Sequence, residues 1–539
     1  MKRNIFFSLW ITCFFIIGFY CISDAKKSIW QCGKELLLRP INCIISHEEA
    51  VSNDMHKNTI AMVRKGNELC QCEREYRLLR SSKVKDTLEK KLNISLDNKR
   101  IPTISIICSG GGYRALLGTI GSLSGLEKIG ILDSVTYISS LSGSTWAVGL
   151  WMSTGMTLKQ LKHYVSKRLM TNFYRINKLE RKRIARMLLI KIAFKQPFSV
   201  VDLFGSLVAH HLFASHFNDK SQMIHLSDQS ELIQKGTVPF PIYTAIDGRM
   251  RAVYGPSWYE FTPCEIGSAN YALYIPTWAF GRTFFNGQST NYAPEQSLGF
   301  LFGTFGSAFG AHLGLAWDHV IKDLTSSPVK SLIQKALVKT KIAQLRIFWA
   351  KVSNFMRGLE IDDINLKKQK YIKLVDAGID CNLPYQPVSG ERVERKPDIL
   401  IFFDFSRSRI PHSLKKSEEY ARKKGLKFPP IDYTDIENKT ISVYQDPHDS
   451  SVPVVIYMPR ISDSALWESK RNDARYKKYK KIEHFNFAEC ALSGFCNTLN
   501  FQYKQYQSKQ VMDQMEFNVL ANEDLIIEAI RSVVERINE

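Results

Sequence analysis

Two motifs about thirty residues apart carry groups suited to acyl transfer. Ser142 follows the β-branched and aromatic run 135–138 and is surrounded by small residues. This pattern predicts a strand that ends in a sharp turn before a helix, where a serine hydroxyl stands clear of the backbone for attack. Gly111 and Gly112 follow the strand-like run 103–108 and precede a helical stretch, so their amide groups can converge on developing negative charge. Together the motifs predict a serine nucleophile facing a set of amide donors.

A serine hydroxyl is a poor nucleophile and needs a base within hydrogen-bond distance. None of the twelve histidines follows a strand in the way a triad histidine normally does. Asp376 is the better candidate, because it ends the strand-like run 371–375 and precedes a tight turn at Ala377-Gly378. In a parallel sheet the carboxyl ends of strands gather at one edge, so we expect Asp376 beside Ser142, although 234 positions separate them (376 − 142). The alternative interpretation is a turn or helix-capping aspartate.

A carboxylate that acts directly on a serine must be partly desolvated and held by its neighbours, because the two pKa values differ by many units. The apolar run before Asp376 is consistent with this requirement. Gly111 and Gly112 would supply the oxyanion donors, each typically worth roughly a hundred- to a thousandfold in rate. Arg114 is expected to point into the same crevice, where its fork of donors suits a phosphate. The alternative interpretation of Arg114 is a surface helix residue.

The composition is that of a folded globular protein with a large excess of basic residues. Lys and Arg number 73 against 52 Asp and Glu, which gives a net charge of +21. Such a charge favours an acidic partner, either nucleic acid or an anionic lipid surface. Because no zinc-finger or RNA-binding signature accompanies it, we expect an anionic phospholipid membrane surface and no nucleic acid. The cysteine and histidine spacings are not typical of metal ligands, so we expect no metal and no cofactor. The oligomeric state is left open.

The N-terminus is typical of an export signal. Lys2 and Arg3 precede the apolar stretch 5–22, and small residues follow at Ser23 and Ala25. The stretch is nearly long enough to span a bilayer, so an uncleaved anchor is the alternative. Either way, we expect the chain to be secreted or membrane-anchored through this segment, and peripheral on membranes.

The remaining chain is expected to form one interrupted domain after a helical arm. We assign 1–25 to the signal or anchor, 26–95 to an N-terminal helical arm and 96–535 to the catalytic domain. From residue 101 onward, strand–turn–helix units alternate, which indicates an α/β fold with a mainly parallel sheet. The basic, helical stretch at about 325–370 is expected to form a cap.

The eleven cysteines leave the disulfide status open. Cys70 and Cys72 belong to a cluster near the N-terminus, where export would permit disulfides. Cys108, Cys264 and Cys381 stand in apolar or turn contexts and are expected to be packing residues.

The motifs closely resemble the catalytic domain of the cytosolic (group IV) phospholipase A2 family, relatives of the patatin-like lipases. The family's three signatures are matched, in the family's order, by Ser109 to Arg114, Leu141 to Trp146 and Val375 to Gly378. The similarity covers about residues 95–535. Further matches are Asp202 to Gly205, Phe261 to Gly267, Phe280 to Gly281, Phe284 to Phe285, Gly306 to Ala308, Asn382 to Tyr385, Phe403 to Ser406, Phe428 to Asp432 and Asn500 to Tyr503.

The resemblance implies a modified α/β-hydrolase-like sheet flanked by helices, with a helical cap over a deep funnel. It implies hydrolysis of the sn-2 ester of glycerophospholipids, often with lysophospholipase and transacylase side activities. By the same resemblance Ser142 is the nucleophile and Asp376 its dyad partner, with no histidine required. Gly111 and Gly112 are the oxyanion donors, and Arg114 holds the substrate phosphate.

Three features depart from the family's pattern. The family usually has glycine two positions before the serine, where this chain has Ser140, and a Cβ in a tight elbow would cost strain. The sequence has no counterpart of the calcium-binding membrane module of several members, so we expect calcium-independent activity. An export-type N-terminus is the third departure.

Lys368 and Lys370, by contrast, match a basic cluster associated in the family with anionic phosphoinositides.

Other functions remain open from the sequence. A lysophospholipase or general lipid acyl hydrolase is the closest alternative. A catalytically dead membrane-binding effector is kept open by Ser140. Nucleotide binding by the glycine loop is disfavoured, because a spaced G-x-G-x-x-G and an acidic residue at the end of a second strand are missing.

Overall fold

A computed structural model provides the coordinates of the chain. It describes residues 54–538 except 97–99, 177–179, 181–182, 185–186, 188–189, 192, 198, 218–222, 250–254 and 310–348. The predicted signal or anchor at 1–25 therefore lies outside the described residues. Within the described part, every helix is too short or too polar to cross a membrane.

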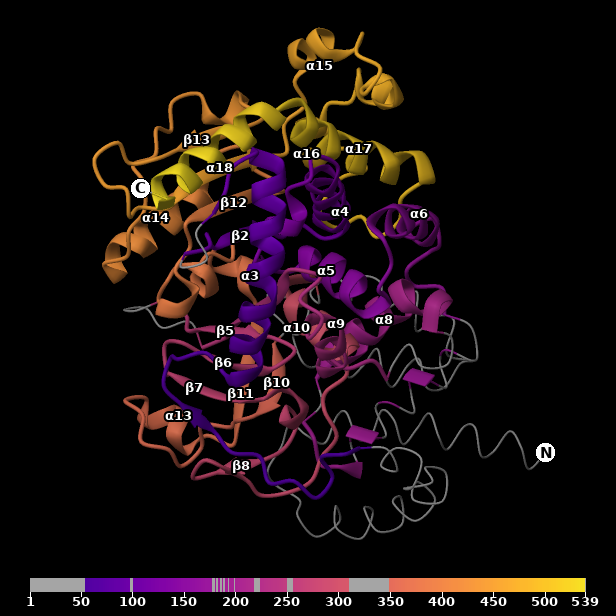
Figure 1. The fold of residues 1–539 in the computed structure, drawn as a ribbon. Coiled ribbons are helices and arrows are strands. Elements are labelled where there is room, and N and C mark those ends of the chain that lie inside the picture. The colour runs from indigo at the N-terminus through magenta and orange to yellow at the C-terminus, as the bar shows by residue number, and fades with distance from the viewer. Residues whose placement is uncertain are drawn as a thin grey trace, which may run out of the picture.

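A mixed sheet runs through the molecule (Figure 1) and contains twelve strands in the described part, in the order β1-β7-β6-β5-β4-β3-β2-β12-β14-β13, with β11 on β4 and β10 on β11. The strands are β1 (Arg64–Lys65), β2 (Ile104–Cys108), β3 (Tyr137–Ser140), β4 (Phe240–Asp247), β5 (Trp258–Phe261), β6 (Glu265–Ser268), β7 (Leu273–Pro276), β10 (Ala350–Ser353), β11 (Tyr371–Asp376), β12 (Ile399–Asp404), β13 (Ser442–Tyr444) and β14 (Val454–Pro459). A separate hairpin contains β8 (Phe284–Phe285) and β9 (Gln288–Ser289). The central strands β4-β3-β2-β12-β14 are parallel, as the alternation of strands and helices predicts. The other pairings are antiparallel, so the prediction of a mainly parallel sheet is wrong outside this centre, where strands follow one another without a crossover helix.

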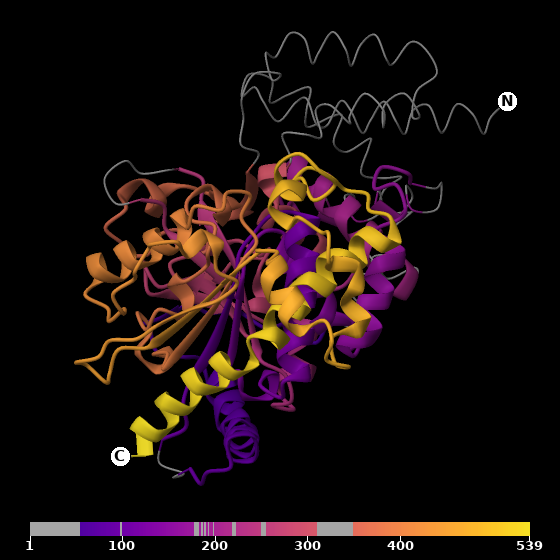
Figure 2. The same ribbon diagram turned by 90° about the horizontal axis from the view of Figure 1, so that it is seen from above.

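Helices cover both faces of the sheet (Figure 2). They are α3 (Gln71–Leu92), α4 (Tyr113–Lys128), α5 (Gly143–Thr154), α6 (Leu158–Arg168), α8 (Val200–Phe217), α9 (Ser230–Ile233), α10 (Leu298–Phe305), α13 (Ile364–Lys368), α14 (His412–Lys424), α15 (Ser464–Lys470), α16 (Phe487–Leu492), α17 (Gln505–Ala521) and α18 (Glu523–Asn538). Successive strand residues point to opposite faces. In β12, Ile401 and Phe403 join the core beneath α4, α5, α8 and α17, whereas Leu400 and Phe402 join the core beneath α14.

The arrangement of β3 and β11 around β4 differs from the prediction. β11 is antiparallel to β4, not parallel, and Asp376 pairs with Ala245. β5 occupies the other edge of β4, so β3 and β11 share one edge, with Ser140 opposite Tyr243. The two strands therefore approach from opposite directions and end two β4 residues apart. This arrangement brings Ser142 and Asp376 together, because both chains leave the sheet at the same place.

In the described part of the predicted N-terminal arm, from residue 54 onward, the helix is α3, which begins at Gln71. This helix is not a solvated arm, since Tyr76, Val84, Leu88 and Leu92 are each at most 2% exposed. One charged, largely polar helix thus contributes to the cores on both faces of the sheet.

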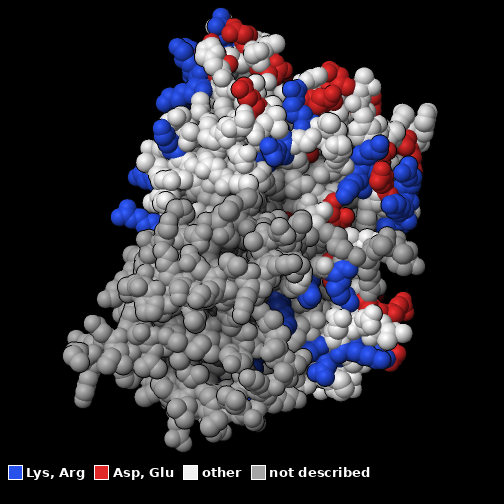
Figure 3. Space-filling view, turned by 180° about the vertical axis from the view of Figure 1, so that it is seen from behind, with Lys and Arg blue, Asp and Glu red and all other residues white. Residues whose placement is uncertain are grey.

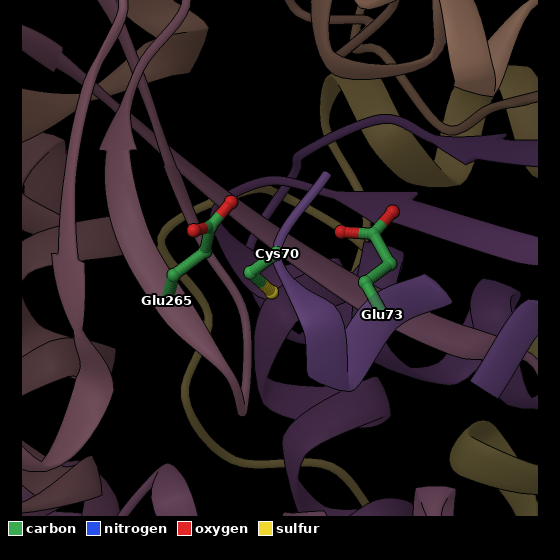
Figure 4. Close-up of side chains that lie close together, drawn as sticks. All are labelled: Cys70, Glu73 and Glu265. Atoms are coloured by element: carbon green, nitrogen blue, oxygen red, sulfur yellow. The ribbon is translucent and has the colours of Figure 1, made fainter. Parts of the chain in front are cut away.

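An acidic cluster next to the start of α3 is neutralised by arginines. The carboxylates of Glu73 and Glu265 flank the Cys70 thiol (Figure 4), and one ligand atom of each lies within 4.8 Å of the others. Arg395 Nε lies 2.6 Å from Glu73, and Arg392 Nη2 lies 2.9 Å from Glu265. Burial and the two carboxylates raise the pKa of the Cys70 thiol to about 12. Because the acids are paired and the thiol stays protonated, this cluster fits an ion network between α3 and the sheet better than a metal site.

Two disulfides occur in the described part of the chain, Cys72–Cys264 and Cys490–Cys496. The first spans 192 positions and ties α3 to the turn before β6. The prediction that Cys264 is a packing residue is therefore wrong, whereas Cys108 and Cys381 are buried free thiols.

The predicted helical cap at about 325–370 lies outside the described residues up to 348. From residue 349 onward the prediction of a helix is wrong, because β10 pairs with β11 and only the short α13 is helical. Gly358 has a φ of +83° and breaks any helix there. Asn354 donates to the carbonyls of Leu366 (2.7 Å) and Gln369 (2.8 Å), which organises the loop.

Candidate active site

Ser142 and Asp376 are in direct contact. Ser142 Oγ donates a hydrogen bond to Asp376 Oδ2 at 2.9 Å, and the residues are 3% and 2% exposed. Ser142 stands between β3 and α5 with φ 50° and ψ −126°. A non-glycine residue in such a conformation costs on the order of 1–3 kcal/mol, and such strain is typical of functional turns. The sharp strand-to-helix elbow predicted from the small residues around Ser142 is therefore present.

Ser140 is accommodated without the predicted strain. It is the last residue of β3, and its backbone is not among those with positive φ. Its buried hydroxyl donates to the Ile242 carbonyl at 3.3 Å. The unusual conformation is confined to Ser142, so a Cβ at position 140 has room in the strand.

Asp376 is held by the turn that follows it and by the segment after α10. Its Oδ1 accepts the Gly378 amide at 2.9 Å, and its own amide donates to Ser307 Oγ at 2.9 Å. Complete burial raises the pKa of Asp376 to about 7, against the opposing effect of hydrogen bonds from the Gly378 amide, the Ser142 hydroxyl and the Ala308 amide. A base with a pKa near the working pH is efficient in proton transfer. The partial desolvation that the sequence argument required is therefore met.

The glycine loop after β2 lies tightly against the serine elbow. Gly111 and Gly112 have φ values of +146° and +61°. A Cβ on Gly112 would come within 2.6 Å of the Thr498 carbonyl oxygen, and one on Gly143 would come within 2.0 Å of the Gly112 oxygen. Within the described ranges, the amides of Gly111 and Gly112 have no acceptor. Unpaired amides next to a nucleophile are available to a ligand oxygen.

Arg114 lies beside the glycine loop, and most of its donors are occupied by the protein itself. It is 1% exposed, so the interpretation as a surface residue is wrong. Its Nε donates to the Phe405 carbonyl (2.8 Å), and Nη1 donates to the Cys496 carbonyl (2.8 Å) and Thr498 Oγ1 (2.9 Å). Burial lowers its pKa to about 9. Its Nη2 has no acceptor among the described residues and lies 2.6 Å from where a Gly111 Cβ would be, which leaves the two N–H groups of this nitrogen at the loop.

Lys368 and Lys370 lie at the end of α13 and just before β11, on the exposed surface. They are therefore not part of the buried site, although only five residues separate Lys370 from Asp376. Lys370 Nζ lies over the ring of the adjacent Tyr371, 5.4 Å from its centroid.

The family model for the lysophospholipase catalytic domain matches residues 104–427, more than half of the chain. The chain belongs to this family. Mus musculus cytosolic phospholipase A2 zeta is 26% identical over 557 residues, which cover 90% of this chain and 64% of the relative. Mus musculus cytosolic phospholipase A2 delta is 26% identical over 539 residues, which cover 88% and 64%. This chain thus spans somewhat less than two thirds of these relatives' length. The resemblance drawn from the motifs is confirmed.

Solved structures confirm the predicted fold class. Human GIVD cytosolic phospholipase A2 matches with a TM-score of 0.74 and 22% identity, over 88% of this chain and 68% of that chain. The same human enzyme in complex with methyl gamma-linolenyl fluorophosphonate matches with a TM-score of 0.68. At this identity the likeness concerns the fold, a modified α/β-hydrolase-like sheet flanked by helices.

The predicted export of the chain is wrong. We expected a secreted or membrane-anchored protein from residues 1–25, but the related proteins are named cytosolic phospholipases A2. The apolar stretch 5–22 is also longer than the apolar core of an ordinary export signal, which has roughly 7–15 residues.

Two residues that support the site were not singled out for a role by sequence reasoning. Ser307 Oγ accepts a hydrogen bond from the Asp376 amide, and the Asn382 side chain forms hydrogen bonds with the amide and the carbonyl of Gly110. Both lie in segments that match the family, Gly306 to Ala308 and Asn382 to Tyr385. The signal for their importance was present, but a role could be assigned only once their partners across the chain were known.

Proposed function

We propose that the chain is a calcium-independent serine phospholipase that hydrolyses the sn-2 acyl ester of glycerophospholipids through a Ser142–Asp376 dyad. The observation that carries the proposal is the 2.9 Å hydrogen bond from Ser142 Oγ to Asp376 Oδ2, beside the Gly111 and Gly112 amides, which have no acceptor in the part of the chain that the structure describes. These groups supply the three requirements of acyl transfer, which are a nucleophile, its base and donors to the oxyanion.

In the first half-reaction, Ser142 Oγ attacks the ester carbonyl carbon while its proton passes to Asp376 Oδ2. The carbonyl oxygen becomes an oxyanion, to which the Gly111 and Gly112 amides donate. As the carbon–oxygen bond to the glycerol breaks, Asp376 returns the proton to the leaving alkoxide, and the lysophospholipid departs. The acyl group stays on Ser142 as an ester.

In the second half-reaction, water replaces the lysophospholipid. Asp376 takes a proton from the water as its oxygen attacks the acyl carbon, and the same two amides stabilise the second oxyanion. Collapse breaks the bond to Ser142 Oγ, which regains the proton from Asp376. The fatty acid leaves, and the dyad returns to its initial state. Arg114 would assist by directing its remaining Nη2 donors to the substrate phosphate.

The test is product analysis by mass spectrometry with a phospholipid that carries different sn-1 and sn-2 chains. We expect release of the sn-2 fatty acid, its loss in Ser142→Ala, and labelling of Ser142 by an alkyl fluorophosphonate. Activity should be equal in calcium and in excess chelator. Full fatty-acid release by folded Ser142→Ala would refute the proposal.

A lysophospholipase is the second candidate, favoured by the description of the family model that matches residues 104–427. Turnover of monoacyl and diacyl substrates by the same preparation separates the two activities. The third candidate, a catalytically dead membrane-binding effector, depends on strain at Ser140. Because Ser140 fits in β3, that reason is weakened, and failure of the fluorophosphonate to label Ser142 would restore it.

We further propose that Lys368, Lys370 and neighbouring lysines bind the protein to an anionic membrane surface. Lys and Arg side chains gather at the lower right of Figure 3, the side on which α13 lies. Lys351 and Lys373 are direct cross-strand partners on β10 and β11, and like charges in such positions repel one another. Among the described residues, none of these four lysines forms a salt bridge. A negatively charged headgroup would relieve that repulsion.

The test is co-sedimentation with vesicles. Lys368→Ala/Lys370→Ala should bind vesicles containing anionic lipid more weakly and neutral vesicles unchanged. A matched control is Lys415→Ala/Lys423→Ala, which removes two exposed lysines from α14 on another part of the surface. Equal loss of binding in both double variants would indicate a general effect of net charge and would contradict a local site.

A further inference from the structure

Asn382 joins the loops that meet at the candidate active site. Its Oδ1 accepts the Gly110 amide at 3.2 Å, and its Nδ2 donates to the Gly110 carbonyl at 3.2 Å. The Nδ2 also donates to Ser406 Oγ at 2.7 Å, in the loop after β12. Its own backbone amide donates to Ser413 Oγ at 3.2 Å, at the start of α14. One side chain thus ties the glycine loop after β2 to the ends of β11 and β12.

Asn382 lies so close to both loops of the dyad that a side chain would collide at Gly110 and be crowded at Gly378. A Cβ on Gly110 would come 2.8 Å from Asn382 Oδ1 and 2.9 Å from Ser142 Cβ. A Cβ on Gly378 would come 3.1 Å from Asn382 Oδ1 and 3.1 Å from Asp376 Oδ1. The side-chain oxygen of Asn382 is therefore separated from Ser142 only by Gly110, and from Asp376 only by Gly378.

We propose that Asn382 is a positioning residue that sets the orientation of the oxyanion donors relative to the dyad. The proposal rests on the proposed function. Pairing with both the amide and the carbonyl of Gly110 fixes the orientation of that residue, and the next two amides along the chain belong to Gly111 and Gly112. Both of these glycines have positive φ, and because glycine is conformationally permissive their own residue type does not fix the direction of their amides. Donors held in place before the reaction lose no free energy in reorganisation.

The amide chemistry of Asn382 is specific to this task. Gly110 presents both a donor, its amide, and an acceptor, its carbonyl. A primary amide side chain can pair with both through one planar group, because it carries an acceptor oxygen and donor N–H groups. An alanine would leave the buried Gly110 amide unpaired among the described residues and its carbonyl with only the long hydrogen bond from Ser109 Oγ, at 3.5 Å. A carboxylate would still accept from the Gly110 amide, but it would face the Gly110 carbonyl and place a negative charge near the developing oxyanion.

The experiment measures hydrolysis and the rate of Ser142 labelling by an alkyl fluorophosphonate at a temperature well below unfolding. In Asn382→Ala we expect kcat and the labelling rate to fall about ten- to a hundredfold, less than the roughly hundred- to thousandfold of removing one oxyanion donor outright. KM should change less than about threefold, because the residue acts through the donors that bind the transition state.

Asn382→Asp provides a second variant with a readout that a merely structural residue would not move. Ionisation of the new carboxyl group should slow labelling as the pH rises, whereas labelling of the wild type should accelerate through the pKa of Asp376. A wild-type pH profile in Asn382→Asp would overturn the proposal. The variant keeps the acceptor for the Gly110 amide, so it tests the idea even if Asn382→Ala does not fold.

Asn522→Ala is the matched control. Asn522 is 8% exposed and donates from Nδ2 to Thr440 Oγ1 (3.1 Å) and the Asn518 carbonyl (2.7 Å), at the end of α17. It should lower the melting temperature without slowing labelling. Equal labelling rates in wild type, Asn382→Ala and Asn522→Ala would overturn the positioning role alone. A wild-type chain that is neither labelled nor active would instead overturn the proposed function.

Discussion

Replacement of Asp376 by asparagine should make the protein more stable at high pH. Asp376 is fully buried, and its pKa is raised from 3.8 to about 7. The folded state therefore binds this proton more tightly than the unfolded state, so the contribution of the carboxyl group to stability is largest below pH 4 and is lost as the pH rises to about 7. Asparagine resembles the neutral form in shape and cannot ionise.

The size of this stability difference follows from the part of the Asp376 pKa shift that lies above pH 5. Between pH 5 and pH 9 the unfolded aspartate is ionised throughout, whereas the folded one ionises only near pH 7. Two pH units at 1.36 kcal/mol each give a loss of about 3 kcal/mol for the wild type that Asp376→Asn does not suffer. Other groups titrate in both proteins, so they cancel when the two are compared.

The assay is urea unfolding of both proteins at pH 5 and pH 9, together with hydrolysis. The free energy of unfolding of the variant minus that of the wild type should rise by about 3 kcal/mol from the lower to the higher pH. Activity should fall by about a hundred- to ten-thousandfold, the usual contribution of a general base, and wild-type kcat/KM should rise with pH through about 7. A stability difference that is the same at both pH values would refute the argument from burial, and an active variant would refute the role as base.

Three further perturbations test parts of the fold and site. Gly112→Ala should reduce activity at least about a hundredfold, because its Cβ would lie 2.6 Å from the Thr498 carbonyl oxygen, whereas Gly425→Ala, with similar φ but nothing within 4 Å, should not. Arg395→Ala should lower the free energy of unfolding, measured in urea, by about 3–5 kcal/mol, since it leaves buried Glu73 without an arginine partner and Glu260 with Arg392 alone. Cys72→Ser should lower it by about 2–5 kcal/mol under oxidising conditions only, and an equal loss in reductant would contradict a disulfide effect.

Much of the local structure could be predicted from short segments. The apolar runs before Gly110, Ser142 and Asp376 form β2, β3 and β11, and the small residues around Ser142 form the elbow. These features depend on neighbours in the sequence, on strand propensity and on the room that glycine and serine leave in a turn. The helix predicted near residue 350 failed, because strand pairing between β10 and β11 overrode its local propensity.

By itself, the sequence determined which groups this protein has for chemistry: a serine in an elbow, an aspartate at a strand end and a glycine loop. Only the tertiary structure decided how they meet. The direction of β11, the clamp of Asn382 on Gly110 and the burial of Arg114 depend on contacts between segments hundreds of positions apart. Local residue patterns do not encode such pairings, because strand order and loop packing are settled by the free energy of the whole core.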